Sequence, residues 1–426
     1  MRSSNTRQLI FLVVFAVCIV LLLGIVMRSN ANAQTGLSLK NGISIDDWDW
    51  DDDEDYWDSD DPTDWLVRYN RVEGLFAGYS VNKDYWREKY PQRAFIYGFG
   101  GYATAAKELE YQVGLEKGFL KKFRFGFGGE YHRMVDTPDR WIVPEFENSL
   151  AAFLLKEDFH DYYLREGGSF YITQRLTYSA ELTFSYTYDI LDSLKKNAHW
   201  ALFGGDKEFR ENPAMSAGEM NALNAELVVD TRISKYDNPQ GWYFMVNGTK
   251  SGGDMGGDYN FDRLVMDVRR YQPLGYDQGL SMRVRTGTAN GILPWQQQFY
   301  LGGISTLRGY RFKSLPGGSR LSPGGNRMFL AQVEFSLGES TFPDEMDLGF
   351  LDLFNIILFT DLGWVGTVDP DAGLFEGFDG MTWKTLKHDL GIALANMDGT
   401  VRLEIARRTD TGHKPFNILF RINKSF

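Results

Sequence analysis

The chain has 426 residues, of which 43% are hydrophobic and 15% aromatic, and it carries a net charge of −12. It is too long for one small domain, and its acidic balance argues against a nucleic-acid-binding protein. The single cysteine, Cys18, excludes a fold built on disulfides.

The N-terminus has the features of an export signal. Basic residues precede an apolar run from Leu9 to Val26, and Ala31-Asn32-Ala33 supplies small residues for cleavage. We therefore expect residues 1–33 to be a signal peptide that is removed after export. An uncleaved inner-membrane anchor is the alternative, because an apolar run of this length can also span a bilayer.

Residues 34–65 form an acidic segment with interleaved aromatic residues. Twelve acidic residues and no basic one lie between Asp46 and Asp64, and the 45 acidic residues elsewhere equal the 45 lysines and arginines. A segment so short and charged rarely folds alone, so we expect it to be disordered. Its alternating aspartates could instead bind calcium, although no glycine turn or distal glutamate completes an EF-hand loop.

Apolar and polar side chains alternate repeatedly from residue 66 to residue 426. Leu109, Val113 and Leu115, for example, share one face of an extended segment, with Glu110 and Glu116 on the other. Successive side chains of a strand point to opposite faces, so each such segment has an apolar face and a polar face. About fifteen of these segments have the length that a tilted membrane strand needs.

This pattern predicts an all-β fold, a transmembrane antiparallel β-barrel that occupies residues 66–426. Bacterial single-chain barrels have an even number of strands, so we predict sixteen. The ambiguous stretch from Glu145 to Tyr163 contains either the missing strand or a short helix in a connection. We expect a hydrated lumen, because ten charged residues lie on the polar faces: Glu226, Asp230, Arg263, Asp267, Arg269, Arg283, Arg285, Glu334, Arg402 and Glu404.

A long glycine-rich connection lies between Trp295 and Arg327. It contains Leu301-Gly302-Gly303 followed by Arg308-Gly309-Tyr310. This motif resembles the BamA/TamA-type family of outer-membrane assembly barrels, the surface-antigen barrel superfamily, in which such a loop folds back into the lumen. The resemblance therefore implies a lumen loop whose tip is Arg308, Gly309 and Tyr310.

Further segments resemble the same family in the same order along the chain. They are a strand from Asn326 to Leu337 with an inward Glu334, the segment Phe359-Thr360-Asp361-Leu362-Gly363, and the closing strand up to Phe426. Arg308 presents a planar fork of donors that suits a carboxylate, so we expect Asp361 and Glu334 to be its partners on the wall. The alternative is an ordinary exposed loop arginine.

The last strand has an apolar face and ends on an aromatic residue. We expect Phe420, Ile422 and Phe426 to form the C-terminal signal by which the barrel-assembly machinery inserts this chain into the outer membrane of a diderm bacterium. Outer-membrane lipid is the other expected partner.

The resemblance implies a barrel that assists insertion or translocation of client proteins into or across the outer membrane. The acidic segment is too short for a periplasmic POTRA domain, which family members carry ahead of the barrel, so delivery of clients is in doubt. A passive channel or structural barrel is the alternative. The five histidines lie beside no nucleophile motif, and no metal-spaced set occurs, so we expect no enzyme activity, no metal and no cofactor.

Overall fold

The structure is a computed structural model, and it describes residues 62–121, 123–233, 239–275, 277–317, 323–338, 341, 354–396, 399–410, 415–424 and 426. The predicted signal peptide (1–33) and nearly all of the predicted acidic segment (34–65) lie outside the described residues. The first strand begins at Thr63, three residues before the predicted start of the barrel.

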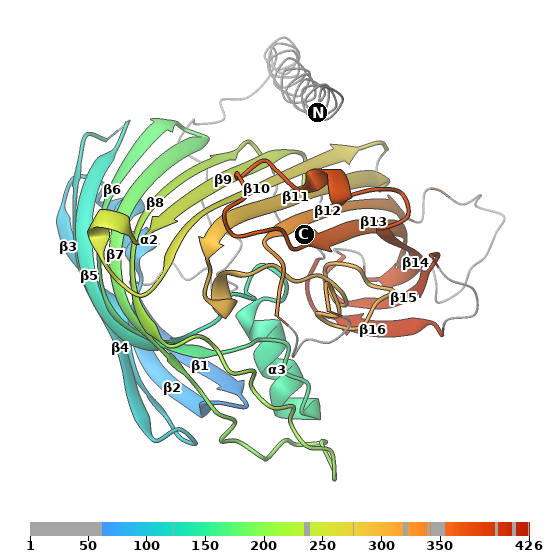
Figure 1. The fold of residues 1–426 in the computed structure, drawn as a ribbon, viewed down its shortest axis with the longest axis horizontal. Helices are drawn as coiled ribbons and strands as arrows, with labels where there is room; N and C mark the ends of the chain where they lie inside the picture. Colours follow the sequence, from blue (N-terminus) through green and yellow to red (C-terminus); the bar gives the residue numbers. More distant parts are fainter. Residues whose placement is uncertain are drawn as a thin grey trace. The chain divides into compact units, whose positions relative to one another are not determined.

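Sixteen strands form one antiparallel sheet in which each strand pairs with its neighbours in sequence (Figure 1). The predicted all-β class and the predicted number of strands are therefore confirmed. The strands are β1 (Thr63–Asn70), β2 (Gly74–Val81), β3 (Ala94–Ala103), β4 (Glu108–Phe119), β5 (Phe125–Asp136), β6 (Tyr163–Thr177), β7 (Ala180–Ser193), β8 (Gly218–Asp230), β9 (Gly241–Ser251), β10 (Asn260–Pro273), β11 (Gly279–Ile292), β12 (Arg327–Leu337), β13 (Asn355–Gly366), β14 (Lys387–Ala395), β15 (Arg402–Arg408) and β16 (Asn417–Arg421).

Among the described residues, two α-helices lie in connections between the strands. Helix α2 (Lys83–Lys89) joins β2 to β3, and helix α3 (Glu145–Leu155) joins β5 to β6. The ambiguous stretch after Glu145 therefore begins with a helix, one of its two predicted alternatives. In the part of the chain that the structure describes, no helix is long and apolar enough to cross a membrane.

The chain turns back sharply after β1. The side-chain oxygen of Asn70 accepts hydrogen bonds from the backbone N–H groups of Val72 and Glu73, at 2.9 and 2.8 Å, which is the geometry of an Asx turn. Residues 63–81 are consequently a hairpin of β1 and β2.

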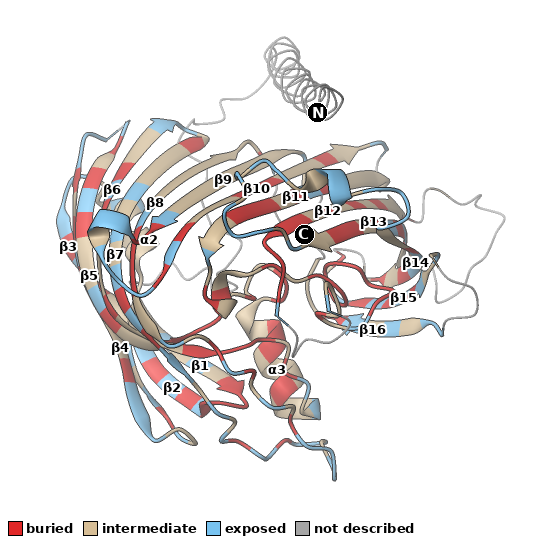
Figure 2. Ribbon diagram, in the orientation of Figure 1, coloured by how far each residue is buried: buried red, intermediate tan, exposed pale blue. Residues whose placement is uncertain are grey.

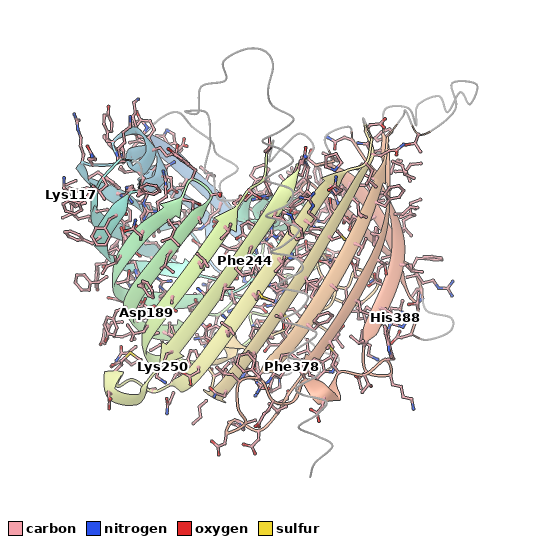
Figure 3. All side chains as sticks on the ribbon, turned by 90° about the horizontal axis from the view of Figure 1, so that it is seen from above. Lys117, Asp189, Phe244, Lys250, Phe378 and His388 are labelled. Carbon is pink, nitrogen blue, oxygen red and sulfur yellow. The ribbon has the colours of Figure 1, made fainter. Side chains whose placement is uncertain are left out.

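The two faces of the sheet differ as the alternation predicts (Figure 2). In β4, Leu109, Val113 and Leu115 are 57–64% exposed on the outer face, whereas Glu110 and Glu116 are buried on the inner face. Long strands tilt across the sheet, with Lys117 near one end and Lys250 near the other (Figure 3). An apolar outer face with an inner face rich in charged groups is the arrangement of a membrane barrel.

Strand β3 is an exception in which the aromatic face points inward. Phe95 and Tyr97 are buried and pack with Tyr171 of β6, whereas Ile96 is 66% exposed on the outside. The tyrosine hydroxyls of this cluster hydrogen bond to each other at 2.8 Å. Both faces of β3 carry apolar residues, so alternation alone does not determine which of them faces the lipid.

Many of the charged residues on the inner face are buried and paired. Asp267 of β10 accepts hydrogen bonds from Arg283 and Arg285 of β11, both at 2.6 Å. Arg402 of β15 contacts Glu334 of β12 at 2.9 Å. Pairs of this kind offset the cost of burying each charge, so the inner face carries an ionic network.

Replacing Val113 on the outer face with arginine should destabilise the barrel. Val113 lies midway along β4, and a charge near the middle of a bilayer costs roughly 2–4 kcal/mol on the lipid face of a barrel. Urea unfolding in lipid vesicles, followed by tryptophan fluorescence, measures the change, with Val113→Leu as the apolar control. Equal stability of the two variants would contradict the assignment of the outer face to lipid.

Candidate functional site: the lumen loop and its anchor

The β11–β12 connection, residues 293–326 and hereafter the lumen loop, folds into the interior of the sheet. Leu301, Leu307 and Tyr310 are buried in one apolar cluster with wall residues that include Val265 of β10 and Leu330 of β12. Among the described residues, the hydrophobic cluster with the most buried members is thus formed between this loop and the wall.

Two glycines give the loop its tight inward bend. Gly302 and Gly303 have φ angles of +120° and +82°, a region that glycine adopts more readily than other residues. The bend closes with a hydrogen bond of 2.8 Å from the N–H of Gly303 to the carbonyl of Leu307. Arg308 follows at once, so the bend directs its side chain at the wall.

Arg308 is fully buried and binds acidic residues of three strands. Its Nε and Nη2 donate to both carboxylate oxygens of Asp361 on β13, each at 2.8 Å. Its Nη1 donates to Glu334 on β12 at 2.6 Å and to Glu404 on β15 at 3.4 Å. The guanidinium carbon lies 3.4 Å from the centre of the Phe359 ring. Bidentate pairing in a dry site is the strongest form of such an interaction.

Other polar groups surround the three acids. Arg402 contacts Glu334 at 2.9 Å and Glu404 at 3.8 Å, and Gln332 donates to Asp361 at 3.1 Å. Two guanidinium groups and one amide thus share three carboxylates. Removal of Arg308 would leave acidic groups buried without their main counter-charge.

The residues after Arg308 extend the anchor to the last strands. The N–H of Gly309 donates to Asp389 of β14 at 2.8 Å. A Cβ atom on Gly309 would lie 2.7 Å from the Cβ of Asp389, so no larger residue fits without a shift of the wall. Asn417 of β16 donates to the carbonyls of Arg308 and Tyr310, at 3.1 and 3.0 Å. The tip therefore contacts every strand from β12 to β16.

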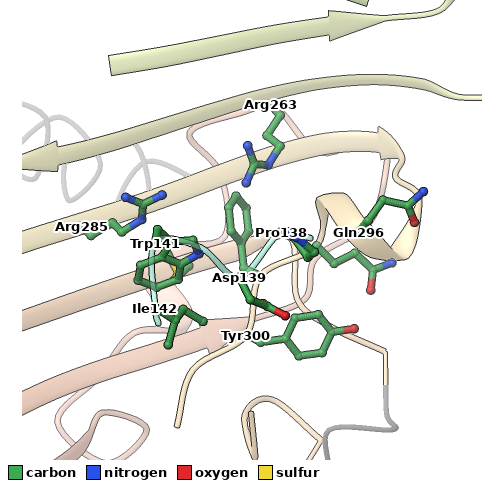
Figure 4. Close-up of a pocket in the computed structure, with 11 residues that line it drawn as sticks. Pro138, Asp139, Trp141, Ile142, Arg263, Arg285, Gln296 and Tyr300 are labelled. Atoms are coloured by element: carbon green, nitrogen blue, oxygen red, sulfur yellow. The ribbon is translucent and has the colours of Figure 1, made fainter. Parts of the chain in front are cut away.

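The body of the loop is also attached to other connections. Lys313 contacts Asp139 and Asp161 of the β5–β6 connection, at 2.6 and 2.7 Å, and all three are buried. A cavity of about 30 Å³ lies between these segments and the wall, lined by residues that include Trp141, Arg263 and Arg285 (Figure 4). That volume holds about two water molecules, so this cavity has no room for a substrate.

The structure brings most of the predicted site residues together. Leu301, Gly302 and Gly303 form the bend, Arg308, Gly309 and Tyr310 form the tip, and Asp361 and Glu334 contact Arg308. The predicted C-terminal signal lies apart from this cluster. Phe420 is 64% exposed on the outer face, and Ile422 and Phe426 follow the end of β16.

Sequence reasoning missed four contacts of the tip: Glu404, Asp389, Asn417 and the Phe359 ring. Glu404 was placed on a polar face, so its inward direction was known, but its meeting with Arg308 depends on the curvature of the sheet. Asp389 and Asn417 carry a weaker signal, because each is one polar residue in a short strand.

Comparison with known proteins identifies the family. The Omp85 superfamily domain matches residues 146–426, which is more than half of the chain. The chain belongs to the Omp85 superfamily. The BamA/TamA-type relationship inferred from the loop motif is therefore confirmed, and members of this family are outer-membrane barrels that assemble or transport proteins.

Two relatives illustrate the extent of the similarity. The outer membrane protein assembly factor BamA of Nitratidesulfovibrio vulgaris is 27% identical over 173 residues, which cover 38% of this Omp85 chain and 21% of the relative. The chain thus spans about a fifth of that protein's length. The structure of BamA from Haemophilus ducreyi lacking POTRA domains 1-3 is 15% identical, with a TM-score of 0.52, over 84% of this chain and 69% of that one. This second likeness concerns the fold alone.

Replacing Arg308 with alanine should lower the stability of the folded barrel. Loss of one partner from a buried ionic cluster costs roughly 3–5 kcal/mol. The heat-resistant folded fraction on a semi-native gel measures the loss. Arg311→Ala is the matched control, because Arg311 is an exposed arginine of the same loop. Equal heat resistance of the two variants would rule out the anchor.

Alanine at Gly309 should weaken the anchor although every charge remains. The added methyl group would press on Asp389 and on the backbone of Arg408, 2.9 Å away. We expect faster proteolysis of the lumen loop in Gly309→Ala. Gly100→Ala is the control, since a Cβ atom at Gly100 would meet nothing within 4 Å. Digestion of the Gly309 variant at the wild-type rate would show that the close approach is unimportant.

Proposed function

We propose that this chain is an outer-membrane barrel that assists the insertion or translocation of other proteins. The proposal rests on the two terminal strands of the sheet, each of which has one edge without a strand partner. Among the described strands, β1 pairs only with β2 and β16 pairs only with β15. Unpaired strand edges are templates for another strand, so a client could extend the sheet at either edge.

The anchor of the lumen loop supports this reading. Arg308 and its neighbours hold β12 to β16 against one loop, which makes the C-terminal wall rigid. A barrel that opens at one side needs such a wall, because opening must not unravel the strands next to the gap. Arg308 and its partners Asp361 and Glu334 have this positioning role in our proposal.

The proposed setting is the outer membrane of a diderm bacterium. Residues 1–33 would direct export, residues 66–426 would form the barrel, and Phe420, Ile422 and Phe426 would present the last strand to the assembly machinery. The partners are outer-membrane lipid, that machinery and client barrel proteins. The apolar outer face, with exposed residues such as Phe416, Ile418 and Phe420, favours lipid as the first partner. We propose no catalytic activity for this chain.

Reconstitution separates an insertase from a passive barrel. Wild-type protein in lipid vesicles should accelerate the folding of an urea-unfolded client barrel, measured by the client's shift on a semi-native gel. Lowering the insertion barrier by about 1.4 kcal/mol gives roughly tenfold acceleration. Vesicles that contain an unrelated barrel at the same protein-to-lipid ratio are the control. Ion conductance in a planar bilayer without any acceleration would favour a passive channel instead.

A further inference from the structure

The two unpaired edges of the sheet do not face empty space. Helix α3, from the β5–β6 connection, lies between β1 and β16 (Figure 1). We call this region the seam, meaning the facing edges of β1 and β16 together with α3.

On one side of the seam, α3 contacts the end of β1. The backbone N–H of Tyr69 donates to the hydroxyl of Ser149 at 3.3 Å, where a neighbouring strand would otherwise accept. Arg68 lies 3.2 Å from Glu145 in the first turn of the helix. The ring of Tyr69 packs edge-on against Phe153, with 5.6 Å between the ring centres.

On the other side, α3 contacts the end of β16 through Glu147. Its carboxylate accepts two hydrogen bonds from the guanidinium of Arg421, at 2.7 and 2.9 Å, and one from the N–H of Ile422 at 3.3 Å. Glu147 and Arg421 are 5% and 1% exposed. The Arg421 side chain also donates to Ser305 of the lumen loop at 2.5 Å.

Helix α3 depends on these contacts for its own stability. It has only 11 residues, its first turn has no side-chain cap, and isolated helices of this length are marginal in water. Its last carbonyls accept hydrogen bonds from Leu202 and Phe203 of the β7–β8 connection, both at 2.8 Å. A short helix held mainly by contacts at its sides can leave when those contacts are lost.

We propose that α3 is a removable stopper of the seam, which occupies the place of a strand between β1 and β16 and must leave before a client strand can pair there. This inference rests on the proposed function and names how access to the same edges is controlled. Glu147 is the main attachment to β16, and Ser149 satisfies one donor of β1.

Charge reversal across the seam tests the attachment. Glu147→Arg and Arg421→Glu alone should each release α3, and amide hydrogen exchange over residues 145–155 should rise roughly a hundredfold, as expected for loss of a buried ion pair. The double variant, Glu147→Arg with Arg421→Glu, restores opposite charges and should recover most of the protection. Glu157→Arg is the control, because Glu157 lies in the same connection as α3 but pairs on the exposed surface with Lys207 of the β7–β8 connection.

Variants that do not fold are recognised by loss of heat-dependent mobility on a semi-native gel. In that case Ser149→Ala, which removes a single hydrogen bond at β1, replaces them and should give a smaller rise in exchange. Unchanged exchange over residues 145–155 in a folded Glu147→Arg or Ser149→Ala barrel would overturn the proposal. So would a double variant that exchanges as fast as the single ones.

A reversible cross-link tests whether α3 must move. Cys18 is the single cysteine of the chain, so in a Cys18→Ser background Glu147→Cys and Arg421→Cys can be joined selectively with a reducible thiol linker. The cross-linked barrel should lose client acceleration and regain it after reduction. Full acceleration with the linker in place would overturn the stopper. No acceleration by the wild type would instead refute the insertase function, while hydrogen exchange would still decide whether Glu147 attaches α3 to β16.

Discussion

The structure depends above all on one buried guanidinium group. Arg308 neutralises carboxylates of the paired strands β12 and β13 and of β15, which lies two strands beyond β13 and meets the same guanidinium because the sheet curves. Without a cation at this point, three acids would face a confined interior and repel each other. The ionic contact therefore sets the spacing of the C-terminal wall as well as the position of the loop that carries it.

The same loop connects the rigid wall to the seam. Arg308 binds the inner face of the wall, and Ser305, three residues earlier, meets Arg421, which binds α3 through Glu147. Lys313 extends the contacts to the β5–β6 connection from which α3 comes. Wall, loop and helix are thus joined by consecutive polar contacts through a single connection, so a change at the seam has a physical route to the anchor.

The sequence carried most of the fold but only part of the site. Alternation gave the sheet and the inward direction of Glu334 and Glu404, because period-two patterning survives in the strands, whereas Asp361 was indicated by the family resemblance of residues 359–363. It did not determine which face of β3 looks outward, since Phe95, Ile96 and Tyr97 are all apolar. It also left α3 undecided, because a short apolar run fits a buried strand and a helix equally well. The four additional contacts of the tip depend on the path of the loop through the interior, and local sequence patterns do not predict that path.

The order of residues along the chain separates Arg308 from the acidic partners that bind it. The strands that bind the tip of the lumen loop through polar contacts, β12 to β16, come later in the polypeptide than the tip itself. Arg308 therefore precedes all of its acidic partners in the chain, and the set is complete only when β15 brings Glu404 to Glu334 and Asp361. A chain that ended before β14 would keep Glu334 and Asp361 but would lack Asp389, Glu404 and Asn417, so the tip would lose its contacts with the last three strands.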